Sequence, residues 1–204
     1  MNAFLRRLTF GLGVVCCGAF VGAADTPAKK AETPPGFPAA DSPEMKAMMA
    51  AMAPGPQHAE LAKAAGEWSA DCEHYMPGGA VEKSKGSAKR TMIMGGRFLR
   101  EEFKGSVMGE PFTGEMILGY DNNLKRFDSV WCDSMSTGVM VSHSKGNDPE
   151  ELVGSMYCPI NRKEVTVRLI TKDKGPDEQL FEMHAPGPDG KETLMMRITY
   201  HRKK

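Results

Sequence analysis

Asp133 is the polar residue whose place in the sequence points most directly to chemistry. It follows Phe127 and Trp131 at even spacing, so on a strand it shares their apolar face. A carboxylate there is costly unless it is paired, and His143 and Arg197 are the candidate partners. Asp133 with His143 would form a general acid–base pair, and with either partner it would form the polar anchor of an apolar pocket. The alternative is a solvated position at the end of the strand.

Histidine and cysteine residues raise a second possibility, haem or metal binding. Cys72 and His74 are two residues apart, and His184 lies on a later strand. The separations between Cys72, Cys132 and Cys158 match no zinc pattern, and these three thiols permit one intramolecular disulfide at most. We therefore expect no metal site and no cofactor, and we keep a haem- or metal-binding barrel as an alternative function.

Sequence motifs for catalysis are missing. The chain has no Gly-x-Ser-x-Gly, no phosphate-binding loop and no dinucleotide fingerprint. Paired acids such as Glu101 and Glu102 are adjacent, so on a strand they point to opposite faces and cannot cooperate. We predict no catalytic residue, and a binding protein fits the sequence better than an enzyme does.

The elements that must position these residues are strands. From Gly66 onward apolar and polar residues alternate, and turn signals such as Pro77-Gly78-Gly79 recur. No long helical segment interrupts the strands, so consecutive strands pair antiparallel around one shared interior. The sequence predicts an all-β fold, an up-and-down antiparallel β-barrel of about 8–10 strands. We interpret four basic residues as a solvated outer face: Lys83, Lys85, Lys89 and Arg90.

Three segments make up the chain. Residues 1–24 have a basic start, an apolar run of about 14 residues and small residues before Asp25, the pattern of a secretory signal peptide. Residues 25–41 are rich in proline and alanine and predict a disordered tether. The domain, residues 42–204, begins with one or two short helices. The first carries a methionine stripe, interpreted as docked on the barrel or alternatively as a surface for a partner: Met45, Met48, Met49 and Met52.

Charge and length exclude two classes of partner. The whole chain has 26 basic and 26 acidic side chains, and cleavage after residue 24 would remove two arginines and no acid, leaving a net charge of −2. Such a chain has no basic excess for a phosphate backbone, so we expect no nucleic-acid partner. The apolar run is shorter than the roughly 20 residues that span a bilayer. We predict an exported protein, periplasmic or secreted, with no transmembrane segment after signal cleavage.

Gly66-Glu67-Trp68 follows a short helix and opens the first strand. This stretch resembles the G-x-W with which lipocalin-type barrels begin. In that group the tryptophan closes one end of the barrel, and a basic side chain from near the chain's end lies across its indole. The resemblance implies a structural plug of Gly66, Trp68 and either Arg197 or Arg202, held by a cation–π contact.

A second resemblance covers residues 43–203. Its motifs are similar to a bacterial exported family known only as a domain of unknown function, and Cys132 looks peculiar to this chain. The resemblance implies a lipocalin-like (calycin-type) barrel and no activity. The stretches that carry it are Pro54-Gly55-Pro56-Gln57-His58, Gly119-Tyr120-Asp121, Phe127 to Ser136, and Tyr200-His201-Arg202-Lys203.

A barrel of this size either fills its interior with side chains or keeps space for one small ligand. Small residues on the inner faces favour the second possibility. We therefore predict an exported barrel that binds a small, largely apolar molecule through Tyr120, Trp131, Asp133 and His143. The alternatives are a periplasmic enzyme that uses the interior Asp/His pair, the haem- or metal-binding barrel, and a packed barrel that serves as a protein-interaction module.

Overall fold

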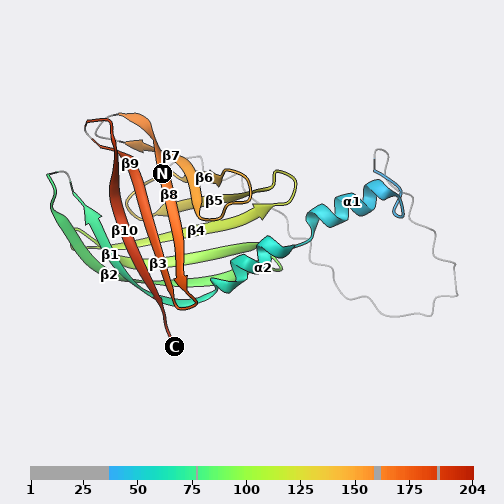
Figure 1. Ribbon diagram of the computed structural model, residues 1–204, viewed down its shortest axis with the longest axis horizontal. Helices are drawn as coiled ribbons and strands as arrows, with labels where there is room; N and C mark the ends of the chain where they lie inside the picture. The colour runs from blue at the N-terminus through green and yellow to red at the C-terminus, as the bar shows by residue number, and fades with distance from the viewer. Residues whose placement is uncertain (1–36, 77, 159–161, 188) are drawn as a thin grey trace, which may run out of the picture.

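The computed structural model describes residues 37–204 apart from 77, 159–161 and 188. The predicted signal peptide, residues 1–24, and residues 25–36 of the predicted tether lie outside the described residues. In the described part, ten strands form one antiparallel sheet that closes on itself, because β1 pairs with β10 (Figure 1). The predicted up-and-down antiparallel barrel is confirmed.

Every strand pairs with its neighbours in sequence, through short connections. The hairpin between β3 and β4 turns through Met108 and Gly109, whose φ angles of 53° and 80° are both positive, as a two-residue type I′ turn requires. The strands are β1 (Gly66–Tyr75), β2 (Val81–Ile93), β3 (Phe98–Val107), β4 (Glu110–Asp121), β5 (Arg126–Asp133), β6 (Met140–Ser144), β7 (Glu151–Cys158), β8 (Lys163–Gly175), β9 (Glu178–Pro186) and β10 (Glu192–Arg202).

From residue 37 onward, two helices precede the barrel, α1 (Pro43–Met52) and α2 (Pro56–Lys63). α2 lies against β3 and β4 and buries His58 and Leu61. His58 also closes the start of its own helix, because its Nδ1 accepts a hydrogen bond from the Gly55 amide at 3.0 Å. No helix in the described part of the chain has the length and apolar character needed to cross a membrane.

α1 extends away from the barrel and buries none of its residues (Figure 1). Its last turn is held by loop side chains, since Arg97 donates to the Met52 carbonyl at 3.0 Å and Asn122 donates to the Ala53 carbonyl at 2.8 Å. Met49 and Met52 are each 58% exposed. The interpretation of a docked methionine stripe is therefore wrong, because polar contacts at one end direct the helix axis outward.

The barrel interior has a buried half and a half-exposed half. Near α2, at what we call the closed end, Leu61 packs with Leu99, Tyr120 and Phe127, all buried. Figure 1 shows the β1–β2 hairpin at the opposite end, which we call the open end. Most inward-facing side chains are only half-buried there, although Ala185 is buried. This open-end lining consists of His74, Glu82, Ser84, Phe112, Trp131, Asp133, Met140, Met183 and Met196.

Candidate ligand-binding site

Trp68 seals the closed end. Its side chain is 2% exposed, and its indole Nε1 donates to the Ala64 carbonyl at 3.0 Å, which ties the barrel to the end of α2. Two guanidinium groups lie on the ring, with Arg202 Cζ 4.2 Å and Arg90 Cζ 5.0 Å from its centroid. The tryptophan is therefore buried at this end, with two basic side chains on its ring.

Arg202, and not Arg197, is the C-terminal cation over Trp68. Trp68 pairs with Arg202 across the β1–β10 ladder, whereas Arg197, five positions away, points to the other face of the sheet. There Arg197 donates to Glu182 at 2.7 Å and to the Tyr75 hydroxyl at 3.2 Å. Its hydrogen bonds hold the pKa of Glu182 below the usual carboxyl value. Arg197 is therefore corrected from the plug to an outer-surface ion pair.

A buried ion pair completes the closed end. Arg90 donates from Nε to Glu101 at 2.5 Å and from Nη1 to Gln179 at 2.8 Å. Tyr200 donates to the second Glu101 oxygen at 3.3 Å, and Arg90 also lies 4.4 Å from the Tyr200 ring centroid. Burial, and next the Glu101 charge, raise the pKa of Tyr200 well above its usual value. Because these groups satisfy one another, we assign them a structural role.

The interpretation of the basic residues of β2 as outer-face residues is correct for the three lysines and wrong for Arg90. Lys83, Lys85 and Lys89 are odd-numbered positions on β2 and are exposed, while Arg90 is 6% exposed on the same face as Ala88. The two-residue period separates Lys89 from Arg90, and it could have identified Arg90 as an interior residue from sequence.

The four predicted pocket residues do not come together. Tyr120 is 6% exposed beneath α2, where its hydroxyl donates to Asn147. Trp131 is opposite Met116, four residues along β4 from Tyr120, a separation of about 13 Å on an extended strand. His143 is exposed and pairs with Asp128, on the outer face. Tyr120 and His143 therefore lie outside the open-end lining, and Asp133 with His143 forms no interior acid–base pair.

Trp131 and Asp133 do meet, at the rim of the open end. Trp131 Nε1 donates to Asp133 Oδ2 at 2.9 Å, and the Met135 amide donates to Oδ1 at 2.9 Å. The indole covers Gly114 so closely that a Cβ there would lie 2.3 Å from the ring. Phe112 stacks beside it at a centroid distance of 6.3 Å. Asp133 is the last residue of β5, the solvated-end alternative considered from sequence, and its carboxylate fixes the indole.

His74 and Glu82 are the polar pair that sequence reasoning missed. They are directly opposite each other on β1 and β2 and face the interior. His74 Nδ1 and Glu82 Oε2 are buried, yet neither atom has a hydrogen-bond partner among the described residues. His74 was considered only as a metal ligand and Glu82 not at all, although even spacing from Ala88 places Glu82 inside. Buried polar atoms in proteins are almost always hydrogen-bonded, so these two atoms can still bond with a ligand group.

The histidines give no metal site in the described part of the chain, where no three His, Cys, Asp or Glu side chains gather closely enough to hold an ion. His74 faces inward, whereas His184 lies on the outer surface beside Glu182. The two histidines named for haem or metal binding therefore lie on opposite faces of the sheet.

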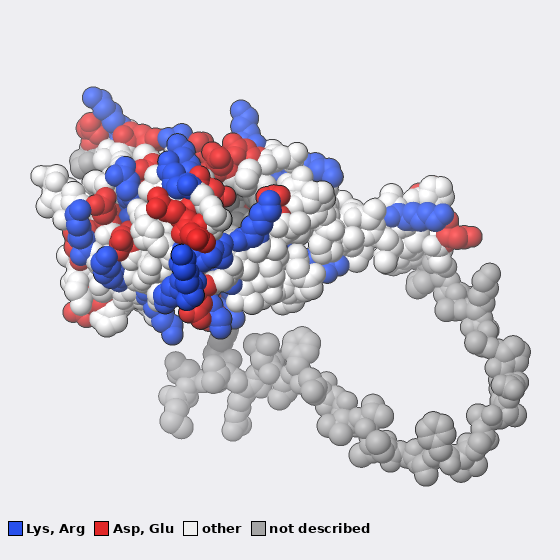
Figure 2. Space-filling model, turned by 60° about the horizontal axis from the view of Figure 1, so that its bottom comes forward, with Lys and Arg blue, Asp and Glu red and all other residues white. Residues whose placement is uncertain are grey.

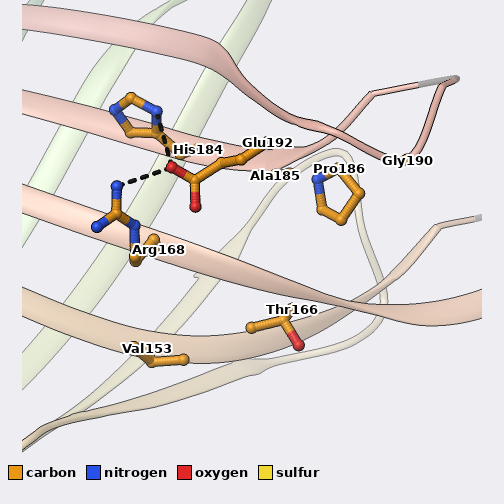
Figure 3. Close-up of a pocket in the computed structure, with 8 residues that line it drawn as sticks. All are labelled: Val153, Thr166, Arg168, His184, Ala185, Pro186, Gly190 and Glu192. Atoms are coloured by element: carbon orange, nitrogen blue, oxygen red, sulfur yellow. Dashed lines mark hydrogen bonds and ion pairs between the residues drawn. The ribbon is translucent and has the colours of Figure 1, made fainter.

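A hollow lies on the outer surface of β7–β10 (Figure 3). Its charges pair with one another: Arg168 donates to Glu192 at 2.7 Å and to Glu151 at 3.1 Å, and His184 is 3.8 Å from Glu192. Its volume is about 190 Å³, and a neighbouring hollow of about 480 Å³ shares Thr166, Pro186 and Gly190 with it. On the face in Figure 2, acidic and basic residues are likewise intermixed. We favour the open end as the ligand site, because the charged side chains of this outer hollow already pair with one another.

Cys72 lies on the inner face between Trp68 and His74 and provides a test of interior burial. It is 4% exposed, and burial raises the pKa of its thiol to about 11 from a usual 9.0. The raised pKa stabilises the fold below pH 9, and this contribution is lost as the pH rises towards 11. We expect the free energy of unfolding, measured with urea, to fall by about 2 kcal/mol across that window.

The Cys72→Ala variant is the control for this prediction. Its fall in stability above pH 9 should be smaller, with Tyr200 supplying what remains. The same pH dependence in both proteins would contradict the assignment.

Comparison with known families matches this geometry to one of them. A family model described as a protein of unknown function, DUF1579, matches residues 53–202, from the end of α1 to the last residue of β10. The chain belongs to the DUF1579 family. The match includes every strand of the DUF1579 barrel together with α2. A search of curated protein sequences finds no match.

Comparison of this DUF1579 protein with solved structures finds one with a TM-score above 0.5. Rv2717c from M. tuberculosis superposes with a TM-score of 0.54 at 14% identity, over 74% of this chain and 99% of that one. The S-type phycobiliprotein lyase CPES from Guillardia theta gives a TM-score of 0.46 at 14% identity, over 72% and 92%. A redesigned β-barrel gives 0.36 at 14% identity, over 71% and 95%. At such identities the likeness to Rv2717c concerns the fold alone.

Proposed function

We propose that this protein is an exported barrel that binds a small, largely apolar molecule at its open end. The observation that carries the proposal is the contrast between the two ends of the interior. The cluster of Leu61, Leu99, Tyr120 and Phe127 near α2 is buried, whereas five apolar residues face inward towards the open end and are only half-buried: Phe112, Trp131, Met140, Met183 and Met196. Apolar surface left in contact with water costs about 25 cal/mol per Å², and a ligand that covers it recovers that free energy.

The chemistry of the open-end lining suits a ligand of this kind. Aromatic and thioether side chains give large apolar contact areas, and methionines adapt to irregular shapes. Trp131 is held in place by Asp133 and by its close approach to Gly114, so the site offers a rigid aromatic wall. Ligand sites characteristically combine such a wall with a few placed polar groups.

The two tryptophans of the chain allow a direct test, because Trp68 lies at the closed end and Trp131 at the open end. We expect 12-bromododecanol, a neutral chain with a heavy-atom quencher, to quench the emission of Trp131 in a saturable way. In the Trp131→Phe variant the remaining emission comes from Trp68, and quenching should be largely lost. Equal quenching of the variant, or quenching without saturation, would argue against the open end as the site.

The export part of the proposal rests on residues 1–24 and is tested separately. N-terminal sequencing of protein isolated from its own host should find a mature chain that begins at Asp25 or close to it. A chain that retains Arg6 and Arg7 would contradict export by a cleaved signal peptide.

A further inference from the structure

We infer that the open end recognises an amine, so that the ligand is a hydrophobic ammonium compound whose cation lies between Glu82 and His74. This inference rests on the proposed function and deepens it, by naming the class of head group. Its basis is the charge of the open-end lining and the two buried polar atoms within it.

The open-end lining is acidic. It contains two carboxylates, Glu82 and Asp133, and neither lysine nor arginine occurs among the described residues that form it. The inward-facing arginines, Arg90 and Arg202, lie at the closed end and are committed to Glu101 and to backbone carbonyls. Lys163 reaches this face only at the exposed first position of β8. A cationic group would therefore be attracted to this end of the interior and an anionic one repelled.

The two carboxylates differ in whether both of their oxygens accept a hydrogen bond. Asp133 accepts hydrogen bonds from Trp131 and from the Met135 amide, so each of its oxygens has a donor. In the described part of the chain, Glu82 has a buried oxygen with no donor, and His74 opposite it has a buried Nδ1 with no partner. An ammonium group carries three N–H donors and no acceptor, so one such group can donate to Glu82 Oε2 and to an unprotonated His74 Nδ1 together.

The apolar surroundings strengthen this choice of head group. A hydrogen bond between a cation and a carboxylate is about twice as strong as a neutral one, and desolvation increases the difference. A fatty-acid carboxylate would instead meet Glu82 and Asp133 as like charges.

Three ligands with the same chain and different head groups test the inference: dodecylammonium, 1-dodecanol and dodecanoate. Each competes with 12-bromododecanol for quenching of Trp131 at pH 7. We expect dodecylammonium to bind at least tenfold more tightly than the alcohol, and dodecanoate to bind most weakly. In Glu82→Gln, which keeps the side-chain shape, the affinity for dodecylammonium should fall about 10- to 100-fold and approach that of the alcohol.

Two further variants complete the experiment. Glu67→Gln removes an exposed carboxylate from the outer face of β1, so it should leave all three affinities unchanged. His74→Phe keeps an aromatic ring and removes Nδ1, so it should weaken dodecylammonium binding and spare the alcohol. Circular dichroism and melting temperature confirm that each variant is folded, and His74→Phe tests the inference independently of Glu82→Gln.

The outcomes separate the inference from the proposed function. Equal or tighter binding of the alcohol or of dodecanoate would overturn the amine assignment and leave the apolar site in place. Unchanged dodecylammonium affinity in Glu82→Gln would overturn it as well. If none of the three ligands nor the brominated probe binds, the proposed function itself fails.

Discussion

Replacing Arg90 with methionine should lower the free energy of unfolding by about 3–5 kcal/mol. Methionine fills much of the same volume, but it leaves the Glu101 carboxylate buried with only the Tyr200 hydroxyl as donor. The hydrogen bond to Gln179 and the stacking on Trp68 are lost at the same time. Equilibrium unfolding in urea, followed by circular dichroism, measures the change.

Two control variants separate burial from charge in this prediction. Arg100→Met, on β3 next to Glu101, breaks an outer-surface pair with Glu115 and should cost less than about 1 kcal/mol. The double variant Arg90→Met with Glu101→Leu removes both charges and should recover most of the loss, because no buried carboxylate is left unpaired. Equal costs at Arg90 and Arg100 would show that the ion pair is not buried in solution.

Trp68→Ala should destabilise the protein by about 3–5 kcal/mol, the range for deleting a large buried aromatic side chain. The variant loses the indole hydrogen bond to Ala64 and the surface on which Arg90 and Arg202 lie. Thermal and urea unfolding measure the effect. The loss should appear as lower stability, with 12-bromododecanol binding kept in whatever fraction stays folded.

Trp131→Ala is the matched comparison, since it deletes the same side chain at the other end of the barrel. Its indole is half-buried and belongs to the open-end lining, so we expect a smaller loss of stability and a loss of ligand affinity of at least tenfold, read by competition with a fluorescent apolar probe. If the two tryptophan variants showed the same pattern, the division of the interior into closed and open ends would be wrong.

The fold could be predicted from sequence because its signal is local and periodic. Alternation on strands such as β5, turn residues such as Met108-Gly109, and the lack of a long helix after Gly66 lead to one closed meander. The placement of Trp68 followed from a resemblance and from its position at the start of β1. The docking of α1 on the barrel was predicted wrongly, because a methionine stripe indicates an amphipathic helix but does not indicate whether another surface covers it.

The candidate site could be predicted only in part, because it depends on distances between strands. Alternation correctly paired Trp131 with Asp133, two residues apart on one strand. It could not bring Tyr120 near Trp131, since the two lie at different heights in the barrel, and it was not applied to His143, which faces outward from β6. His74 with Glu82 required the register of β1 against β2, which a single sequence does not specify.

The hydrogen bonds of Arg202 at the closed end join the last strand of the barrel to the chain just before its first strand. Arg202 donates to the carbonyls of Ala65 and Lys63, which lie 137 and 139 residues earlier in the chain. Contacts of such long range slow folding, and here they include the ladder that closes the sheet. The barrel cannot close until β10 has been synthesised, because β10 pairs with β1. The strands made before β10 therefore form an open sheet with unpaired edges until that strand is added.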